Sequence, residues 1–262
     1  MKFTLKRLIF IIILTSITKN SLCHEFWIDP KNYHLSKNEK AVANIFIGEN
    51  FEGSPIPFTK EYFKISFLHS KDGKSKIKGR LGDIPALNIK KMSQGLNVIQ
   101  IESVTKYVEY EKLVKFEIFT REKGYPNLAQ KHRENNYPEN FFESYKRYAK
   151  SLISVENFDG KDIDTNMDFE LIFLDNPLKN LNESKRILLE YKNKILADHK
   201  VSIMSLNNGY FRKEYVRTNK GGYFDYLFKE NTKYLIESVV IIEGSNKKKD
   251  NYAKWHLSLI HI

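Results

Sequence analysis

The residues best suited to chemistry lie near the start of the chain, in the stretch His24-Glu25-Phe26-Trp27-Ile28-Asp29-Pro30. Cleavage after Cys23 would make His24 the first residue of the mature protein. Its free α-amine and its imidazole Nδ1 could then close a chelate on one metal ion, because such groups titrate near neutral pH, at about 8 and about 6.5. Nitrogen donors of this kind suit Cu(II), Ni(II) and Zn(II). A first-position histidine also arises by chance, because signal peptidase cuts before many residue types.

Residues 1–23 have the three parts of a secretory signal peptide. A basic start is followed by the apolar run Leu8–Leu14 and by the cleavage-site sequence Ser21-Leu22-Cys23. The run is shorter than the roughly 20 apolar residues that a membrane span needs, and no later stretch approaches that length. We therefore expect a soluble periplasmic protein with no transmembrane helix after cleavage. Lipidation of Cys23 is the alternative and would block the amine, but the bulky Leu22 before it argues against that.

The composition limits both the partners and the ligands of the mature chain. The full sequence of 262 residues has a formal charge of +11, and the first 23 residues contribute four basic side chains and no acid, which leaves +7. The basic residues are spread along the chain apart from Lys247-Lys248-Lys249, a distribution that does not favour a nucleic-acid binder. Cys23 is the only cysteine, so a metal site in the mature chain must use histidine, carboxylate, amine or carbonyl groups.

The residues after His24 predict a β-sandwich followed by a helical segment, over 24–160. Strands are expected at Ala41–Ile47, Tyr62–Leu68 and Leu96–Ile101, because these runs are apolar or alternate with a period of two. Two helices are expected, at Tyr110–Lys123 and Glu139–Leu152, since their apolar residues recur at spacings near three and four. We interpret the polar stretch between them, Gln130 to Pro138, as a loop.

A polar stretch at 157–167 marks the expected boundary to a second domain, over 161–262. Turn signals such as Asn207-Asn208-Gly209 separate about seven short apolar runs there, the strand count of an immunoglobulin-like sandwich. The strands are expected at Phe169–Leu174, Arg186–Tyr191, Val201–Met204, Phe211–Val216, Tyr223–Phe228, Tyr234–Ile242 and Trp255–Ile262. The fold expected is mainly β, with two immunoglobulin-like or β-sandwich domains and a short helical insert between them.

The order and spacing of several motifs resemble the periplasmic family catalogued as domain of unknown function 4198. The matching motifs are His24 to Pro30, Gly48-Glu49-Asn50-Phe51-Glu52-Gly53-Ser54-Pro55-Ile56-Pro57, Gly82-Asp83-Ile84-Pro85-Ala86, Tyr145 to Leu152, Arg217 to Phe224, and Trp255 with Ser258-Leu259. The resemblance implies a periplasmic component linked to nickel or cobalt uptake, with a membrane transporter component as partner. It also implies a divalent transition metal as ligand, nickel first and Cu, Co or Zn as the other candidates.

The sequence departs from that family in the strand Tyr234–Ile242. Relatives usually carry a histidine followed by a methionine near its end, where this chain has Val240 and Ile241. If that histidine is a ligand in relatives, metal binding here would be weaker, would use another residue, or would be absent.

The remaining histidines do not identify a further ligand. They are His34, His69, His132, His199, His256 and His261, and no HxH or HxxxH pair occurs among them. A surface or hydrogen-bonded histidine is the more common case for each. Alternation places His261 on the face of Trp255, Leu257 and Leu259, with His256 on the opposite face. Phe26 and Trp27 fit core packing better than sugar stacking, and Glu25 and Asp29 could orient the imidazole or be exposed.

Signals for catalysis are weak. The chain has no nucleophile elbow, no HExxH, no glycine-rich phosphate loop and no cysteine pair. A copper oxygenase would also use a first-position histidine, but no second histidine stands out for it, so we do not expect an enzyme. The expected function is a periplasmic metal-binding protein, centred on His24, that assists uptake of a divalent transition metal. The alternative is a metal-free β-sandwich module for adhesion or scaffolding in the cell envelope.

Overall fold

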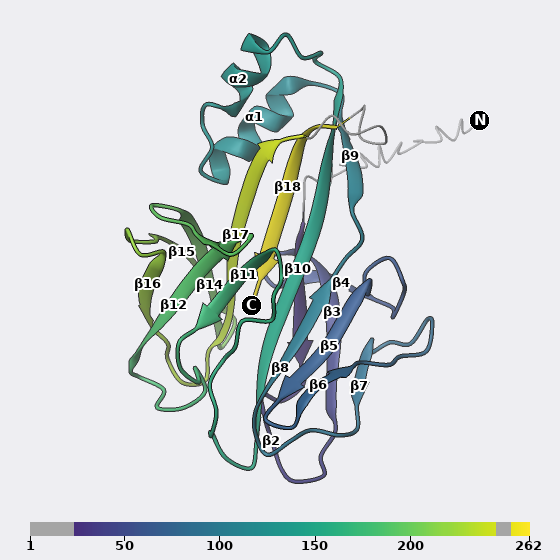
Figure 1. Ribbon diagram of the computed structural model, residues 1–262, viewed down its shortest axis with the longest axis vertical. Helices are drawn as coiled ribbons and strands as arrows, with labels where there is room; N and C mark the ends of the chain where they lie inside the picture. Colours follow the sequence, from purple (N-terminus) through teal and green to yellow (C-terminus); the bar gives the residue numbers. More distant parts are fainter. Residues whose placement is uncertain (1–23, 245–252) are drawn as a thin grey trace, which may run out of the picture.

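The computed structural model describes residues 24–244 and 253–262, and its backbone is mainly β (Figure 1). The expected signal peptide at 1–23 and the basic cluster Lys247-Lys248-Lys249 lie outside the described residues. Within the described part of the chain, no helix is long and apolar enough to cross a membrane.

One ten-stranded sheet, here called the central sheet, runs through the molecule. Its main order is β15-β14-β17-β18-β10-β8-β5-β6, and β2 and β9 also pair with β10. The bounds are β2 His34–Leu35, β5 Ile65–Ser70, β6 Gly73–Lys76, β8 Gly95–Glu102, β9 Lys106–Tyr110, β10 Phe141–Val155, β14 Lys200–Asn207, β15 Tyr210–Arg217, β17 Lys233–Glu243 and β18 Ala253–His261. The long strand β10 pairs in parallel with β18 and antiparallel with β8 and β9.

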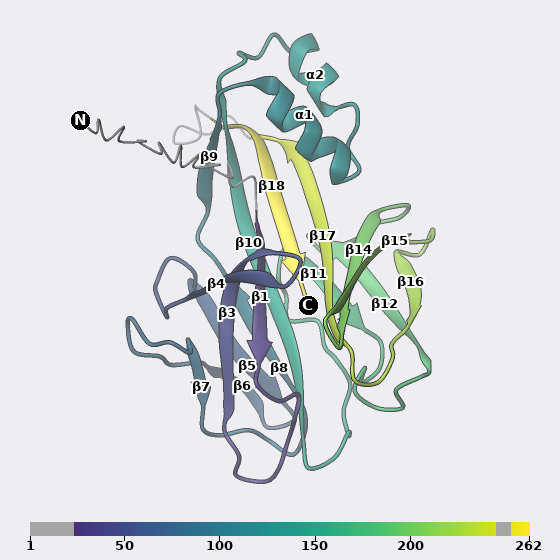
Figure 2. The same ribbon diagram turned by 180° about the vertical axis from the view of Figure 1, so that it is seen from behind.

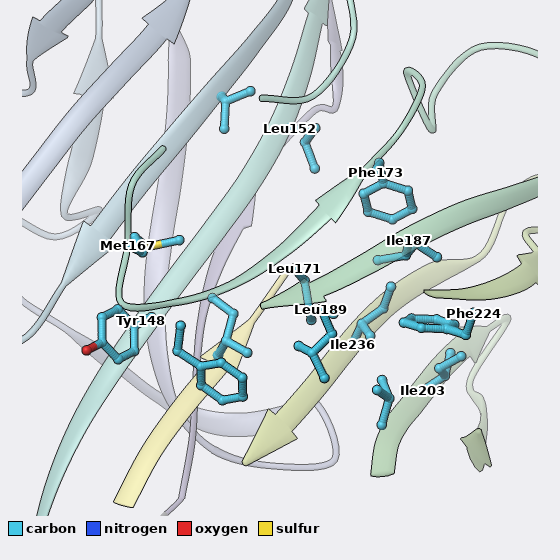
Figure 3. Packing of buried hydrophobic residues seen from close by; sticks show 14 of the residues in the cluster. Tyr148, Leu152, Met167, Leu171, Phe173, Ile187, Leu189, Ile203, Phe224 and Ile236 are labelled. Atoms are coloured by element: carbon cyan, nitrogen blue, oxygen red, sulfur yellow. The ribbon is translucent and has the colours of Figure 1, made fainter. Parts of the chain in front are cut away.

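Two smaller sheets cover opposite faces of the central sheet (Figures 1 and 2). The first small sheet contains β1 Glu25–Pro30, β3 Ala41–Glu49, β4 Glu52–Ile56 and β7 Leu87–Ile89. The second contains β11 Phe169–Phe173, β12 Ser184–Tyr191, β13 Lys194–Ile195 and β16 Tyr223–Leu227. Successive residues of β10 point to opposite faces, so Ala149 and Ile153 join the core under the first small sheet, whereas Tyr148 and Leu152 join the core under the second. Figure 3 shows this second core, with side chains from β10, β11, β12, β14, β16 and β17.

Two helices form the insert between β9 and β10. They are α1 Leu113–Glu122 and α2 Leu128–Glu134, and they cover one end of the central sheet (Figure 1). Phe116 and Phe119 of α1 pack with Trp255 and Leu257 of β18 in a third core. The helix expected within Tyr110–Lys123 is confirmed. The loop expected at Gln130 to Pro138 is wrong in part, because α2 extends into it.

The second expected helix, Glu139–Leu152, is wrong, because those residues form most of β10. The physical reason is that β10 is buried on both faces. Apolar side chains from both faces, read along one strand, gave spacings near three and four that imitate a helix. Long-range pairing with β8, β9 and β18 then overrides the local pattern.

The predicted mainly β fold with packed sheets is confirmed, and each strand expected in the second half has a counterpart among β11 to β18. The central sheet takes strands from both sides of residue 160, since β5, β8 and β10 precede it and β14, β17 and β18 follow it. The division into domains at 24–160 and 161–262, and the immunoglobulin-like topology, stay predictions.

Candidate metal site

A tight hairpin between β3 and β4 brings a carboxylate beside His24. Glu25 pairs with Gly48 across β1 and β3, so the next residue back, His24, lies opposite Glu49. The turn residues Asn50 and Phe51 both have positive φ, 55° and 66°, as a two-residue type I′ hairpin requires. A Cβ at Gly48 would lie 1.9 Å from the carbonyl oxygen of Glu52. The glycine therefore allows the narrow hairpin that holds Glu49 in place.

The imidazole of His24 presents an unused nitrogen at this position. Its side chain is 23% exposed, and Nδ1 lies 3.5 Å from Glu49 Oε1. Nδ1 is buried and has no hydrogen-bond partner among the described residues. This is the nitrogen that a chelate with the α-amine would use. Within residues 24–244 and 253–262, no group of three or more His, Cys, Asp or Glu side chains is close enough to hold a metal ion.

The neighbouring Glu25 supports the hairpin from inside. Its side chain is buried, and its Oε2 accepts a hydrogen bond of 2.9 Å from the backbone N–H of Asn50. Burial, together with the negative charge of Glu237, raises the pKa of Glu25 to about 7. Asp29 instead lies 2.7 Å from Lys233 Nζ in an ion pair. Neither carboxylate has a recorded hydrogen bond to the imidazole of His24, so the expectation that they orient it gains no support.

A layer of buried charged and polar side chains continues from Glu25 between the helices and the first small sheet. We call it the polar seam, and its members are Glu25, Lys123, Arg147, Glu237 and His261. Each comes from a different element, and all except Lys123 are less than a tenth exposed. Lys123 Nζ lies 2.6 Å from Glu237 Oε1, and His261 Nε2 lies 3.4 Å from Glu237 Oε2. These two contacts join β17, β18 and the end of α1.

The charges of the seam follow from burial and pairing. Burial by itself would raise the pKa of Glu237, but the ammonium group of Lys123 outweighs it and holds that pKa well below its usual range. Burial also lowers the pKa of His261, so this imidazole is neutral at pH 7 and Lys123 is the cation that balances Glu237. Burial lowers the pKa of Lys123, but the carboxylate of Glu237 raises it by more. The pKa of Lys123 is therefore above the usual value for a lysine.

Most other histidines are held by ordinary hydrogen bonds or packing, as the sequence interpretation expected. His132 accepts from Trp255 Nε1 at 3.1 Å, and its Nε2 lies 2.8 Å from the carbonyl oxygen of Pro138. The others with recorded partners are His69 with Gln100, His199 with the Val239 carbonyl, and His256 with Ser144. The ring of the exposed His34 stacks on Phe158. Phe26 and Trp27 are buried core residues, as expected.

Val240 and Ile241, the two positions where the resemblance led us to expect histidine and methionine, point to opposite faces of β17. Val240 belongs to the core under the second small sheet, whereas Ile241 packs under the helices. Glu237 shares the face of Ile241, because the two are four residues apart on one strand. Position 240 therefore faces away from the polar seam and from His24.

Sequence reasoning found His24 but missed the polar seam. A signal existed, since Glu237 is the only charged residue inside the apolar run Leu235 to Ile242. A lone charge inside a strand that is apolar on both faces indicates a buried, paired group. Its partner Lys123 lies 114 residues away, and no local pattern connects the two.

Comparison with curated proteins found no match. A family model matches residues 22–241, which is most of the chain and includes His24, Glu49 and Glu237. The chain therefore belongs to the family described as a domain of unknown function, DUF4198.

Proposed function

We propose that the mature chain is a periplasmic protein that binds a divalent transition metal, nickel first, through the α-amine and imidazole Nδ1 of His24 and assists its uptake by a membrane transporter. The observation that carries this proposal is the unused, buried Nδ1 of His24, 3.5 Å from Glu49 Oε1. The proposed function includes no enzymatic reaction.

The donors at this position fit a borderline metal better than a hard one. Two nitrogens and one carboxylate oxygen suit Ni(II), Cu(II), Co(II) or Zn(II), whereas Mg²⁺ and Ca²⁺ prefer oxygen ligands throughout. Glu49 is 60% exposed, so its carboxylate can rotate toward an ion held by the chelate. With only these protein donors, water would complete the coordination, and an ion held in this way can be released to a partner.

The change at Val240 does not count against the site. Because that side chain faces the core under the second small sheet, a histidine there would not point toward His24. A relative that used it as a ligand would need a different site from the one proposed for this chain.

The test is titration calorimetry of the protein isolated after export, with its N-terminus established by mass spectrometry. We expect Ni(II) binding that is lost in His24→Ala and in a variant with one alanine inserted before His24, since the insertion moves the amine away but keeps the imidazole. Glu49→Gln should weaken binding, and His34→Ala, which removes an exposed histidine elsewhere, should leave it unchanged. Affinity should fall as pH is lowered, because both nitrogens must be deprotonated to bind the ion.

Equal affinity in the wild type and the insertion variant would refute the chelate. Absence of binding for Ni(II), Cu(II), Co(II) and Zn(II), with an unchanged melting temperature in each, would favour the metal-free adhesion or scaffolding module. Binding of a ligand at a hundredfold excess over its Kd stabilises the folded state by about 2.7 kcal/mol, which a melting curve resolves.

A further inference from the structure

A lysine and two carboxylates converge inside the protein, on the face of the central sheet away from His24. Lys150 Nζ of β10 lies 2.8 Å from Asp162 Oδ1 and 2.8 Å from Glu170 Oε1. The side chains of Lys150 and Asp162 are 0% exposed, and that of Glu170 is 2% exposed. Asp162 precedes β11 and Glu170 lies within it. The group therefore links the central sheet to the second small sheet beneath their shared core.

The charge of this group is unbalanced. One ammonium group faces two carboxylates, and removing charges from water costs several kcal/mol per ion. Burial raises the pKa of Asp162 and of Glu170, although Lys150 opposes the shift in both. The surroundings therefore favour a state with fewer charges, in which one carboxyl holds a proton.

Backbone groups fix the two carboxylates on either side of the lysine nitrogen. Asp162 Oδ1 accepts from the N–H of Ile163 at 2.8 Å, and Oδ2 accepts from the N–H of Phe173 at 2.9 Å. Glu170 Oε1 accepts from the N–H and the hydroxyl of Thr165, each at 3.0 Å. The Asp162 carboxyl carbon is thus held beside Nζ, with the N–H of Phe173 placed to stabilise negative charge on Oδ2.

We propose that Lys150 and Asp162 condense into an intramolecular amide, with Glu170 as the proton acceptor. Glu170 takes a proton from the ammonium group, and the neutral Nζ attacks the carboxyl carbon of protonated Asp162. A C–N bond forms, a second proton of the nitrogen passes to the departing hydroxyl, and the C–O bond breaks to release water. The ammonium group, the protonated Asp162 and the Glu170 carboxylate are thereby converted to one amide, one water and a protonated Glu170, with no oxidant or co-reactant. The product removes two buried charges and fastens the 157–167 segment to β10.

Two lysine–glutamate pairs with less buried lysines provide a comparison inside the same chain. Lys146 Nζ lies 2.7 Å from Glu102, and Lys123 Nζ lies 2.6 Å from Glu237. Among residues 24–244 and 253–262, no second carboxylate lies within hydrogen-bond distance of either lysine, and the Glu122 carboxylate is 3.9 Å from Lys123 Nζ. Without a second carboxylate to accept the proton, these pairs are expected to remain ionic.

Tryptic peptide mass spectrometry of the purified wild-type protein tests the proposal, and it requires no variant to fold. Trypsin should fail to cut after Lys150, and peptides 148–161 and 162–179 should appear joined, lighter than their sum by one water. Cleavage after Lys146 and Lys123 should be normal. In Asp162→Ala the joined species should disappear, and in Glu170→Gln it should be lost or form slowly.

Complete cleavage after Lys150 in the wild type, with peptides 148–150, 151–161 and 162–179 at their free masses, would overturn the proposal and leave a non-covalent ion cluster. A joined species in Asp162→Ala would show that another residue is the acyl partner and would equally overturn it. Neither result depends on metal binding at His24.

Discussion

Replacing Glu143 by glutamine should stabilise the protein at neutral pH, although the residue lies in the longest strand of the central sheet. Glu143 is 0% exposed, and neither carboxylate oxygen has a hydrogen-bond partner among the described residues. Burial raises the pKa of Glu143 to about 8, and no charged neighbour contributes to the shift. The folded state therefore holds this side chain as a neutral acid at pH 7.

The magnitude follows from the linkage between protonation and folding. In the unfolded chain the carboxyl of Glu143 ionises above its ordinary value of 4.5, whereas in the folded state it keeps its proton up to about 8. Because the folded pKa is the higher one, stability is lost as pH rises through this window. At pH 7 the loss is about 3 kcal/mol, at about 1.4 kcal/mol per pKa unit. Glutamine fills the same space and cannot ionise, so the variant should be more stable than the wild type by roughly that amount.

Urea denaturation of the wild type, Glu143→Gln and Glu109→Gln at acid and neutral pH measures this difference. Glu109 is the matched control, because it lies on the neighbouring strand β9 and is exposed. The advantage of Glu143→Gln should be present at neutral pH and nearly absent at about pH 4, where both states of the wild type are protonated. An advantage that does not change with pH, or a variant less stable than the wild type at pH 7, would refute the assignment of a buried neutral acid.

Three further changes test other parts of the structure. Lys123→Met should destabilise the protein by about 3–5 kcal/mol in thermal or urea denaturation, because it leaves the buried charge of Glu237 unpaired. Pairing lowers the pKa of Glu237. The stability that the pair contributes is therefore present at neutral pH and is lost as the pH falls below the ordinary pKa of a glutamate. Gly48→Ala should abolish Ni(II) binding in calorimetry with the remaining fold intact by circular dichroism, because its Cβ would meet the Glu52 carbonyl oxygen at 1.9 Å. Val240→His should cost about 1–3 kcal/mol of stability and leave Ni(II) affinity unchanged, since position 240 faces the core.

The strands that could be predicted were those whose local sequence matched their final environment. The turn at Asn208-Gly209, both with positive φ, separates β14 from β15 where the asparagine–glycine signal placed it. The arrangement of the sheets could not be predicted in the same way. The parallel pairing of β10 with β18 joins Tyr145 to Leu257, and no turn or short connection specifies a contact over that separation.

The same distinction between local sequence signals and long-range contacts applies to the candidate site. His24 could be identified from its position after the expected signal peptide, which is a local property. Glu49 as its neighbour depends on the register of β1 against β3, because a shift of one residue would turn every side chain to the other face. The polar seam depends on contacts between elements more than a hundred residues apart, such as Lys123 with Glu237.

The stretch Glu139–Leu152 was expected to be a helix, which could turn its charged residues to solvent. It forms most of β10, a strand covered on both faces, so Arg147 and Lys150 lie inside the protein. Each of the three buried charged groups on β10 must therefore be accommodated by a different means. Glu143 keeps its proton, the guanidinium of Arg147 lies 4.7 Å from the ring centre of Tyr145, and Lys150 meets two carboxylates. Only the last arrangement places an amine, a carboxyl carbon and a proton acceptor together, and for that reason bond formation is expected at Lys150 and not at the other two.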